Sequence, residues 1–290
     1  MRGVATARSA ISVVNALPLG IGSALGIDWP ARTAARFDPA SDRSTRTTVE
    51  PASSDTRLVR LSARSALRQF GGAGPARLRL VVRSTIPMSR GLKSSSAVSA
   101  SVVLATARAL GKEPTAITVA RLAAEASRAA GVSATGAFDD ALAGLVTGGV
   151  VTDNRHDREL RRLELDPDLA VALWVPERPH PRSLRVRARF HRAPALARRA
   201  VDAALSGEWA LAMELNSSLV EAAMGYRYGG LHGAVRRAGA VASGVSGLGP
   251  TFAAVAPWDR LRSVVRALPP EGRRRMVRLL PLDGRPHGSP

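Results

Sequence analysis

The sequence predicts a mixed fold of helices and strands, and two observations favour this class. The first is a strand-like run at residues 77–83 that leads, through a loop, into an alanine-rich helical run ending at Leu110 before Gly111. The second is that runs of helical and of extended character follow one another along the chain, with glycine-containing loops between them. Both kinds of element are therefore expected to pack around a common core.

Composition sets the limits within which this fold is expected. The length of 290 residues allows one large domain or two small ones, and 45% hydrophobic residues is ordinary for a chain with a buried core. The chain has no cysteine, which excludes disulfides and thiolate metal sites. Five histidines lack metal-ligand spacing and are each expected at the surface or in a loop: His156, His180, His191, His232 and His287.

The formal net charge of +19 invites a role in nucleic-acid binding, but the way it is distributed suits small anionic substrates as well. All of the 42 basic residues except Lys93 and Lys112 are arginines, and they are spread along the chain. Aromatic residues make up only 4% of the chain, which leaves few platforms for the stacking of single-stranded bases. One of the two lysines falls in the loop before the alanine-rich helix.

The N-terminal segment does not read as a signal peptide, because Asn15, Pro18, Gly20 and Gly22 interrupt its apolar residues. No apolar run in the sequence reaches the length of a transmembrane helix. A cytoplasmic protein with no membrane partner is therefore expected.

The loop within residues 87–97 has the features of a phosphate site at a helix N-terminus. Serines at 94–96 precede the apolar run and are expected to cap the helix. The first turn of a helix presents backbone N–H groups and the positive end of the dipole, which both favour phosphate. Gly91 lets the backbone approach a ligand, Lys93 adds a positive charge, and the serine hydroxyls can bind phosphate or a metal ion. On spacing alone, an ordinary capped helix explains the segment about equally well.

The residues before this loop predict a strand, a loop and a strand within 5–28, where Gly20 and Gly22 suit either a hairpin turn or a close backbone approach. The stretch from 32 to 74 is polar at first. It is expected to contain edge strands near 46–49 and 57–61 and a short helix at 62–70.

The residues after the first helix predict a second one at 115–130, which ends before Gly131. Asp139 and Asp140 then stand at an expected helix start, where carboxylates suit the dipole and can also supply a general base or hold Mg²⁺. A buried strand at 149–152 and a polar turn at 153–157 follow, and the domain boundary is expected here.

The C-terminal half is expected to form a second unit of helices and strands. Strands are predicted at 169–175, 252–255 and 275–280, and helices at 192–205, 208–224, 231–241 and 258–267. A Pro- and Arg-rich segment covers 176–187, a glycine loop covers 244–251, and residues 284–290 are expected to form a frayed tail.

Several of these motifs resemble those of the GHMP kinases, and most closely those of archaeal-type shikimate kinases. Residues 90–97, Arg-Gly-Leu-Lys-Ser-Ser-Ser-Ala, are similar to the family's phosphate-binding motif. The Asn15-Ala16 pair with its glycine turn resembles the first motif, and Ser246 to Pro250 matches the third, Ser-Gly-x-Gly-Pro. The run Thr-Gly-Ala-Phe-Asp-Asp-Ala at 135–141, with the Thr-Asp-Asn at 152–154, also looks like this family. Three glycine loops in the family's order are hard to assign to chance.

The resemblance implies the GHMP kinase fold with two α+β domains. The N-terminal domain, residues 1–155, would contain an unusual left-handed β-α-β unit, against the usual right-handed rule. The C-terminal domain, residues 156–290, would be ferredoxin-like. ATP and substrate would meet in the cleft between them.

The resemblance also implies transfer of the ATP γ-phosphate to the 3-hydroxyl of shikimate, in aromatic amino acid biosynthesis, with ATP and Mg²⁺ required. Asp139 would accept the hydroxyl proton, with Asp140 as the alternative, and Lys93 would offset developing charge. ATP binding is expected at Pro87, Ser89, Arg90, Gly91, Leu92, Lys93, Ser94, Ser95, Ser96 and Ala97, of which Ser94 and Ser95 would also contact Mg²⁺. Substrate binding is expected at Asn15, Arg90, Arg155, Ser246, Gly247 and Gly249, with an arginine on the shikimate carboxylate. The expected partners are ATP and shikimate, with no nucleic acid, for a monomer or homodimer.

Two other functions stay open at this point. A GHMP kinase for another polyol or alcohol, such as a cyclitol, homoserine or a mevalonate-type alcohol, is the nearer one, because a few pocket contacts set acceptor specificity. A basic nucleic-acid-binding protein is the more distant one. Its binding would weaken by about 10³-fold or more over a few-fold rise in salt concentration, whereas saturable ATP turnover would not behave that way.

Overall fold

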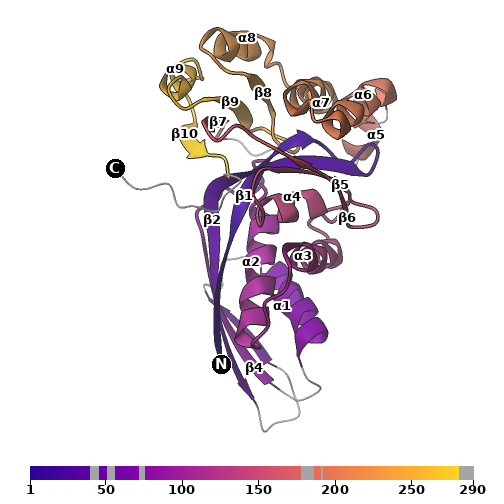
Figure 1. Ribbon diagram of the computed structural model, residues 1–290, viewed down its shortest axis with the longest axis vertical. Helices are drawn as coiled ribbons and strands as arrows, with labels where there is room; N and C mark the ends of the chain where they lie inside the picture. Colours follow the sequence, from indigo (N-terminus) through magenta and orange to yellow (C-terminus); the bar gives the residue numbers. More distant parts are fainter. Residues whose placement is uncertain (40–45, 51–55, 72–75, 178–185, 191, 281–290) are drawn as a thin grey trace.

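The computed structural model describes residues 1–39, 46–50, 56–71, 76–177, 186–190 and 192–280. Figure 1 shows an elongated molecule, with the N-terminus at one end and the elements of the C-terminal half gathered at the other. Among the described residues, the strands form a six-stranded sheet in the N-terminal half and a four-stranded sheet in the C-terminal half. Helices pack against both sheets.

The first sheet is built on a long antiparallel pair of strands. It contains β1 (Arg2–Val14), β2 (Ile21–Pro39), β3 (Arg46–Glu50), β4 (Ala76–Ser84), β5 (Gly149–Asp153) and β6 (Arg158–Leu163). One side of β2 pairs with β1, and its other side pairs with β4 toward one end and with β5 toward the other. β2 continues well past Asp28 because Ala31, Thr33 and Ala35 are buried while the residues between them face solvent.

Helices α1 (Thr56–Phe70), α2 (Ser94–Ala109), α3 (Ala116–Ala130) and α4 (Phe138–Ala143) belong to the same half. Helix α2 packs against β1 and β2 and lies beside α1 and α3 (Figure 1). Small side chains allow this close packing: a Cβ at Gly3 would lie 2.3 Å from the carbonyl oxygen of Ala105. The prediction of a helix ending just before Gly111 is confirmed, since α2 ends at Ala109 with its C-cap at Leu110.

The start of α2 differs from the prediction. The serines at 94–96 are the first helical residues, and the N-cap is Lys93, in a left-handed conformation and without a side-chain capping bond. The expected capping by serine is therefore wrong. The left-handed turn at Lys93 brings the chain directly into the helix, so that the serine amides occupy its first turn.

Residues 57–61 are helical, and the predicted edge strand there is wrong. They belong to α1, whose buried residues recur at helical spacing: Leu58, Val59, Ser62, Ala63, Ser65 and Ala66. A run of five residues is too short for its period to separate helix from strand. Strands β3 and β4 on either side of α1 pair in parallel, which makes α1 the crossover of a β-α-β unit. The left-handed connection expected for this unit stays a prediction.

The second sheet is antiparallel and contains β7 (Leu169–Val175), β8 (Ala242–Val245), β9 (Phe252–Pro257) and β10 (Arg273–Arg278). Its order, β10-β7-β9-β8, places the first and third strands in the centre, as in the predicted ferredoxin-like arrangement. The helices of this half are α5 (Val186–Phe190), α6 (Pro194–Ser206), α7 (Trp209–Met224), α8 (Gly229–Arg237) and α9 (Leu261–Arg266).

Two strands were not predicted. β6 follows the polar turn at 153–157, and its sequence Arg-Glu-Leu-Arg-Arg-Leu lacks the apolar–polar alternation that marks a strand. β8 occupies 242–245, so the glycine loop is shorter than predicted and α8 ends at Arg237 rather than Val241. Part of the Pro- and Arg-rich segment (178–185), His180, His191, His287 and the predicted tail lie outside the described residues.

The two halves share a hydrophobic core. One cluster of buried side chains joins Ile11 and Leu25 of the first sheet with Val171 of the second and Met213 of α7. The chain also returns to the first sheet after β10, where the amide of Leu280 donates to the carbonyl of Gly26 at 3.0 Å. The first sheet runs on to Leu163, past the expected boundary at 155, and the division into two domains stays a prediction.

Candidate active site

Three loops that are far apart in the sequence meet at the N-terminus of α2. The glycine loop, residues 246–251, lies between β8 and β9 and packs onto the phosphate loop, residues 85–93. The hydroxyl of Ser246 donates to the carbonyl oxygen of Gly91 at 2.7 Å. The end of β1 completes the group, because Gly247 donates its amide to the hydroxyl of Ser12 at 3.0 Å. The structure thus brings together the three motifs predicted from the sequence.

The phosphate loop is held in left-handed backbone conformations. Ser89, Gly91 and Lys93 have φ values of 56°, 82° and 55°. Such values are uncommon for residues other than glycine and cluster at functional sites. Inside α2, the amide of Ala97 bonds the carbonyl of Lys93 at 3.0 Å. The amides of residues 94–96 precede this bond, at the end of the helix that favours anions.

The predicted ATP-binding residues differ in how far their side chains are exposed. Ser94 and Ser95 are half-buried at the start of α2, where their hydroxyls can reach a ligand. The side chains of Leu92 and Ala97 belong to the hydrophobic core, so only their backbone groups can face a phosphate. Pro87, Arg90 and Gly91 are half-buried in the loop, Ser89 is exposed, and Ser96 is buried.

Lys93 and Asp140 form a nearly buried ion pair. Nζ of Lys93 lies 2.8 Å from Oδ1 of Asp140, and both side chains are 11% exposed. The contact is an ion pair by distance, without the angles of a hydrogen bond. Nζ also lies close to the glycine loop, since a Cβ at Gly247 would be 3.4 Å from it. The ammonium is therefore held between α2, α4 and the glycine loop.

Asp139, the neighbour of Asp140 in the first turn of α4, is buried and held by Asn154. The amide nitrogen Nδ2 of Asn154 donates to Oδ1 of Asp139 at 2.7 Å, while its Oδ1 accepts from the hydroxyl of Thr152 at 2.6 Å. The other carboxylate oxygen lies against β2, because a Cβ at Gly22 would be 2.4 Å from Oδ2. Only glycine fits at position 22 with this placement of the carboxylate.

The pKa of Asp139 is raised by this environment to about 7. Burial is the largest cause, followed by the charge of Asp140, while Lys93 and the Asn154 hydrogen bond act in the opposite direction. A carboxyl group with a pKa near neutrality is well matched to accept a proton from an alcohol.

Of the predicted substrate-binding residues, Ser246, Gly247 and Gly249 lie in the glycine loop, and Asn15 and Arg155 lie at the first motif. Asn15 donates its side-chain amide to the carbonyl of Gly247 at 3.3 Å, which ties the first motif to the glycine loop. Arg155 is exposed and lies against the first motif, since a Cβ at Gly20 would be 2.4 Å from its Nε. Arg90 differs, because its guanidinium donates to the carbonyl of Pro176.

Three residues were missed as site residues. Asn154 orients Asp139, Ser12 joins β1 to the glycine loop, and Asn216 of α7 accepts the amide of Asn15 at 2.8 Å. The Thr-Asp-Asn run after the strand was a usable signal for Asn154. The partners of Ser12 and Asn216 are distant in sequence, and no local pattern marks them.

No metal cluster of His, Asp or Glu side chains is found among the described residues. The oxygen donors at the start of α2 and α4 nevertheless suit Mg²⁺, which commonly uses one or two carboxylates together with substrate phosphates. Among the residues that the structure describes, no helix is long and apolar enough to cross a membrane.

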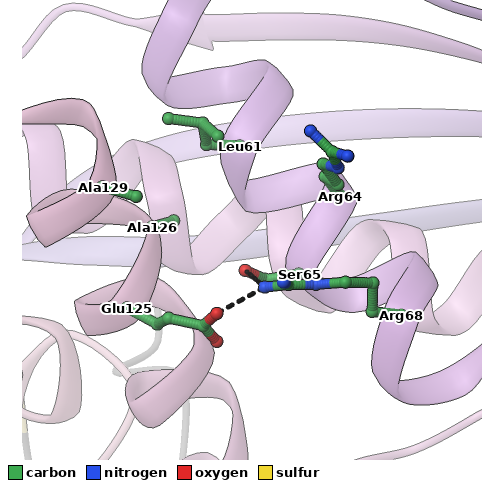
Figure 2. A pocket seen from close by; sticks show the side chains of 7 residues that line it. All are labelled: Leu61, Arg64, Ser65, Arg68, Glu125, Ala126 and Ala129. Carbon is green, nitrogen blue, oxygen red and sulfur yellow. Dashed lines mark hydrogen bonds and ion pairs between the residues drawn. The ribbon is translucent and has the colours of Figure 1, made fainter.

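A pocket of about 150 Å³ lies between α1 and α3 (Figure 2). Leu61 and Ala126 supply part of its apolar lining, and an ion pair between Arg68 and Glu125 spans it. None of the predicted site residues lines this pocket. It is therefore separate from the group of loops at the N-terminus of α2.

Replacing Gly91 by Ala is expected to abolish most activity, because the new Cβ would lie 2.0 Å from the carbonyl oxygen of Ser246 and push the two loops apart. Gly111→Ala is the matched control: its φ of 73° is similarly left-handed, but a Cβ there meets nothing. Both variants should lose about 1 kcal/mol of stability from the backbone conformation. Only Gly91→Ala should lower kcat/KM for ATP, and equal losses in the two variants would contradict this account.

Comparison with known proteins gives a consistent result. Residues 57–148 match the family described as GHMP kinases N terminal domain. The chain is 35% identical over 270 residues to a shikimate kinase of Pyrococcus abyssi, and the match covers 92% of this chain and 95% of that protein. It is 40% identical over 263 residues to a shikimate kinase of Methanothrix thermoacetophila, with 88% and 85% covered.

Solved structures show the same fold at much lower identity. A mevalonate kinase of Methanococcus jannaschii has a TM-score of 0.73 at 12% identity, covering 97% of this chain and 99% of that one. A homoserine kinase of Cytophaga hutchinsonii has a TM-score of 0.70 at 16% identity, covering 97% of both chains. The predicted fold class is thereby confirmed.

Proposed function

This chain belongs to the family of the archaeal shikimate kinases, which are GHMP kinases, and on that premise we propose that it transfers the γ-phosphate of ATP to the 3-hydroxyl of shikimate. The observation that carries the proposal is the pairing of Lys93 with Asp140 beside the buried Asp139, at the N-terminus of α2. Phosphoryl transfer depends mainly on positioning and on neutralisation of charge, and this group of residues supplies both.

The phosphates of ATP would bind at the first turn of α2. The backbone amides of residues 94–96 and the hydroxyls of Ser94 and Ser95 would face the ligand there, and the helix dipole favours its negative charge. Lys93 adds a positive charge beside the transferred group, where charge develops in the transition state. The left-handed conformations of the loop keep these groups in place before ATP arrives.

Asp139 would act as the base. Its carboxylate accepts the proton of the acceptor hydroxyl while the hydroxyl oxygen bonds to the γ-phosphorus and the bond from that phosphorus to the bridging oxygen of ADP breaks. Asn154 fixes the orientation of this carboxylate through the 2.7 Å hydrogen bond. Asp140 is the alternative base, but its contact with Lys93 makes it the better counter-ion.

Mg²⁺ would bind between the nucleotide and the protein, where it neutralises phosphate charge. The hydroxyls of Ser94 and Ser95 and the carboxylate of Asp140 are the groups that would hold it. No cluster of three or more His, Asp or Glu side chains that could hold a metal ion is found among the described residues. Most ligands of the Mg²⁺ would therefore be phosphate oxygens and water.

Arg155 would bind the carboxylate of shikimate. Its guanidinium lies against Gly20 and is exposed, whereas the guanidinium of Arg90 already bonds the carbonyl of Pro176. A planar guanidinium suits a carboxylate because two parallel hydrogen bonds can form. Acceptor and ATP would then meet between residues 1–155 and 156–290, taken as the two domains, in a cytoplasmic enzyme that acts as a monomer or homodimer.

A coupled ADP-release assay with a panel of acceptors tests this proposal. Shikimate, quinate, homoserine, mevalonate and a few cyclitols would each be offered with Mg-ATP. We expect shikimate to give a kcat/KM at least about 100-fold above any other acceptor, because each of the others lacks a feature of shikimate: the cyclitols lack the carboxylate, homoserine and mevalonate lack the ring, and quinate lacks the ring double bond that flattens shikimate next to its carboxylate. Turnover of another acceptor in place of shikimate would change the substrate assignment. A folded protein that turns over none of these acceptors would contradict the kinase proposal.

A further inference from the structure

The glycine loop is held from two sides, and only one of them is the phosphate site. Toward the site, Ser246 bonds Gly91 and Gly247 lies beside Lys93. The other side faces the end of α7 and the residues that follow it. In the described part of the chain, Tyr226, Tyr228 and Glu221 on that second side make no hydrogen bond to the phosphate loop or to Asp139 and Asp140.

The chain's two tyrosines bind the backbone of the glycine loop. The hydroxyl of Tyr226 donates to the carbonyl of Leu248 at 2.8 Å, and the hydroxyl of Tyr228 donates to the carbonyl of Pro250 at 3.1 Å. The ring of Tyr226 also covers the loop, because a Cβ at Gly249 would lie 2.6 Å from its Cε2.

The rings of these tyrosines are themselves fixed. They stack on each other at 5.3 Å between centroids, with an angle of 3° between their planes. Tyr228 also packs edge-on against Trp174 of β7 and Phe252 of β9. Burial raises the pKa of Tyr226 to about 12 and that of Tyr228 further, so both hydroxyls keep the proton that they donate.

A half-buried polar network holds the tyrosines from the side away from the glycine loop. Glu221 of α7 accepts the backbone amide of Tyr228 at 3.0 Å and contacts Nε2 of His232 at 2.8 Å. The same carboxylate accepts the hydroxyl of Ser217, which in turn accepts the amide of Val245 at 3.0 Å, one residue before the loop. Both ends of the glycine loop are thereby connected to one carboxylate. The network is fully connected, and such networks fix a single arrangement.

We propose that Tyr226 and Tyr228, fixed by Glu221 and its partners, are positioning residues that hold the glycine loop against the phosphate loop for phosphoryl transfer. They act through the loop: Leu248 and Pro250 set where Ser246 and Gly247 lie, and these set the place of Gly91 and Lys93. The inference rests on the proposed kinase function. A displacement of about 1 Å at such a site can cost up to about 100-fold in rate even when it originates away from the reacting atoms.

The test is the double variant Tyr226→Phe/Tyr228→Phe, which removes two hydroxyls and keeps both rings. We expect kcat to fall about 10-fold while the Kd for ATP, measured by calorimetry, changes less than about 3-fold, because the α2 amides remain in place. Hydrogen exchange should become faster in residues 246–251 and stay unchanged in β7 and β9. A general loosening of the fold would accelerate exchange in all three segments alike.

Ser217→Ala and Ser218→Ala form a matched pair in the same helix. Ser217 supports the amide of Val245, whereas the hydroxyl of Ser218 bonds the carbonyl of Glu214 on the exposed side of α7. Only Ser217→Ala should lower kcat and loosen the loop. Unchanged kcat and unchanged loop exchange in the tyrosine double variant would overturn the inference, as would equal loosening of β7 and β9. Because exchange needs no acceptor, this readout decides the inference even where the parent enzyme fails to phosphorylate shikimate.

Discussion

Replacing Asp139 by Asn is expected to lower kcat by about 100-fold or more, because the variant can no longer accept the proton of the acceptor hydroxyl. The KM for ATP should change little, since the phosphates bind at the first turn of α2. The fold should survive, because an asparagine oxygen at this position can still accept the hydrogen bond from Asn154.

The control for this variant is Asp28→Asn, which removes one carboxylate from an exposed pair with Arg8 at 2.9 Å. Its kcat should stay within about 2-fold of the parent, as exposed ion pairs contribute little. The comparison with Asp140→Asn assigns the base. Near-normal turnover in Asp139→Asn together with a large loss in Asp140→Asn would move the base to Asp140.

The same variant has a second signature in its pH dependence. The pKa of Asp139 is raised to about 7 in the folded protein from its ordinary value of 3.8, so the folded state holds this proton more tightly than the unfolded chain does. Its contribution to stability is therefore present at low pH and is lost as the pH rises from about 4 through about 7. Thermal unfolding midpoints across this range should fall less in Asp139→Asn than in the parent, and kcat of the parent should rise over the same interval.

Replacing Lys93 by Met is expected to lower kcat/KM for ATP by about 100-fold or more, because it removes the positive charge placed beside the transferred phosphate. It should also reduce stability by about 3 kcal/mol, since the carboxylate of Asp140 is left buried without its partner. Coupled ADP release and thermal unfolding measure the two effects separately.

The chain offers a close control in Lys112→Met. Lys112 is the other lysine of the sequence and is exposed after the end of α2, so neither activity nor stability should change. The double variant Lys93→Met/Asp140→Asn should recover stability, because no charge is left unpaired, but not activity. Recovery of activity in the double variant would mean that Lys93 only neutralises Asp140.

The parts of the fold that follow from local signals were predicted well. Helix α2 was expected from an alanine-rich apolar run and helix α3 from apolar residues at helical spacing, each with a glycine after its end. Gly111 and Gly131 have the positive φ values that such ends favour. The glycine loop was recognised through its resemblance to the Ser-Gly-x-Gly-Pro motif, although its first two predicted residues belong to β8. The prediction of a strand at residues 57–61 was wrong because five residues are too few for their periodicity to distinguish a strand from a helix.

The parts of the site that depend on long-range contacts were not predicted. Lys93 and Asp140 were both candidates, but no pattern in the sequence says that they touch. His232 was expected at the surface or in a loop, yet it lies in a helix and bonds Glu221 in a half-buried network. The motif residues were found because a single segment carries each of them. Their partners come from another segment and become apparent only when the chain is folded.

The most direct test of the central claim is to identify the product by NMR after incubation of the enzyme with Mg-ATP and shikimate. The account predicts ADP and an equal amount of a single phosphate ester, whose phosphorus couples to the proton on carbon 3 of shikimate, with Asp139→Asn forming it at least about 100-fold more slowly. ADP formed without an ester, or an ester at another hydroxyl, would contradict the assignment of this site to transfer onto the 3-hydroxyl of shikimate.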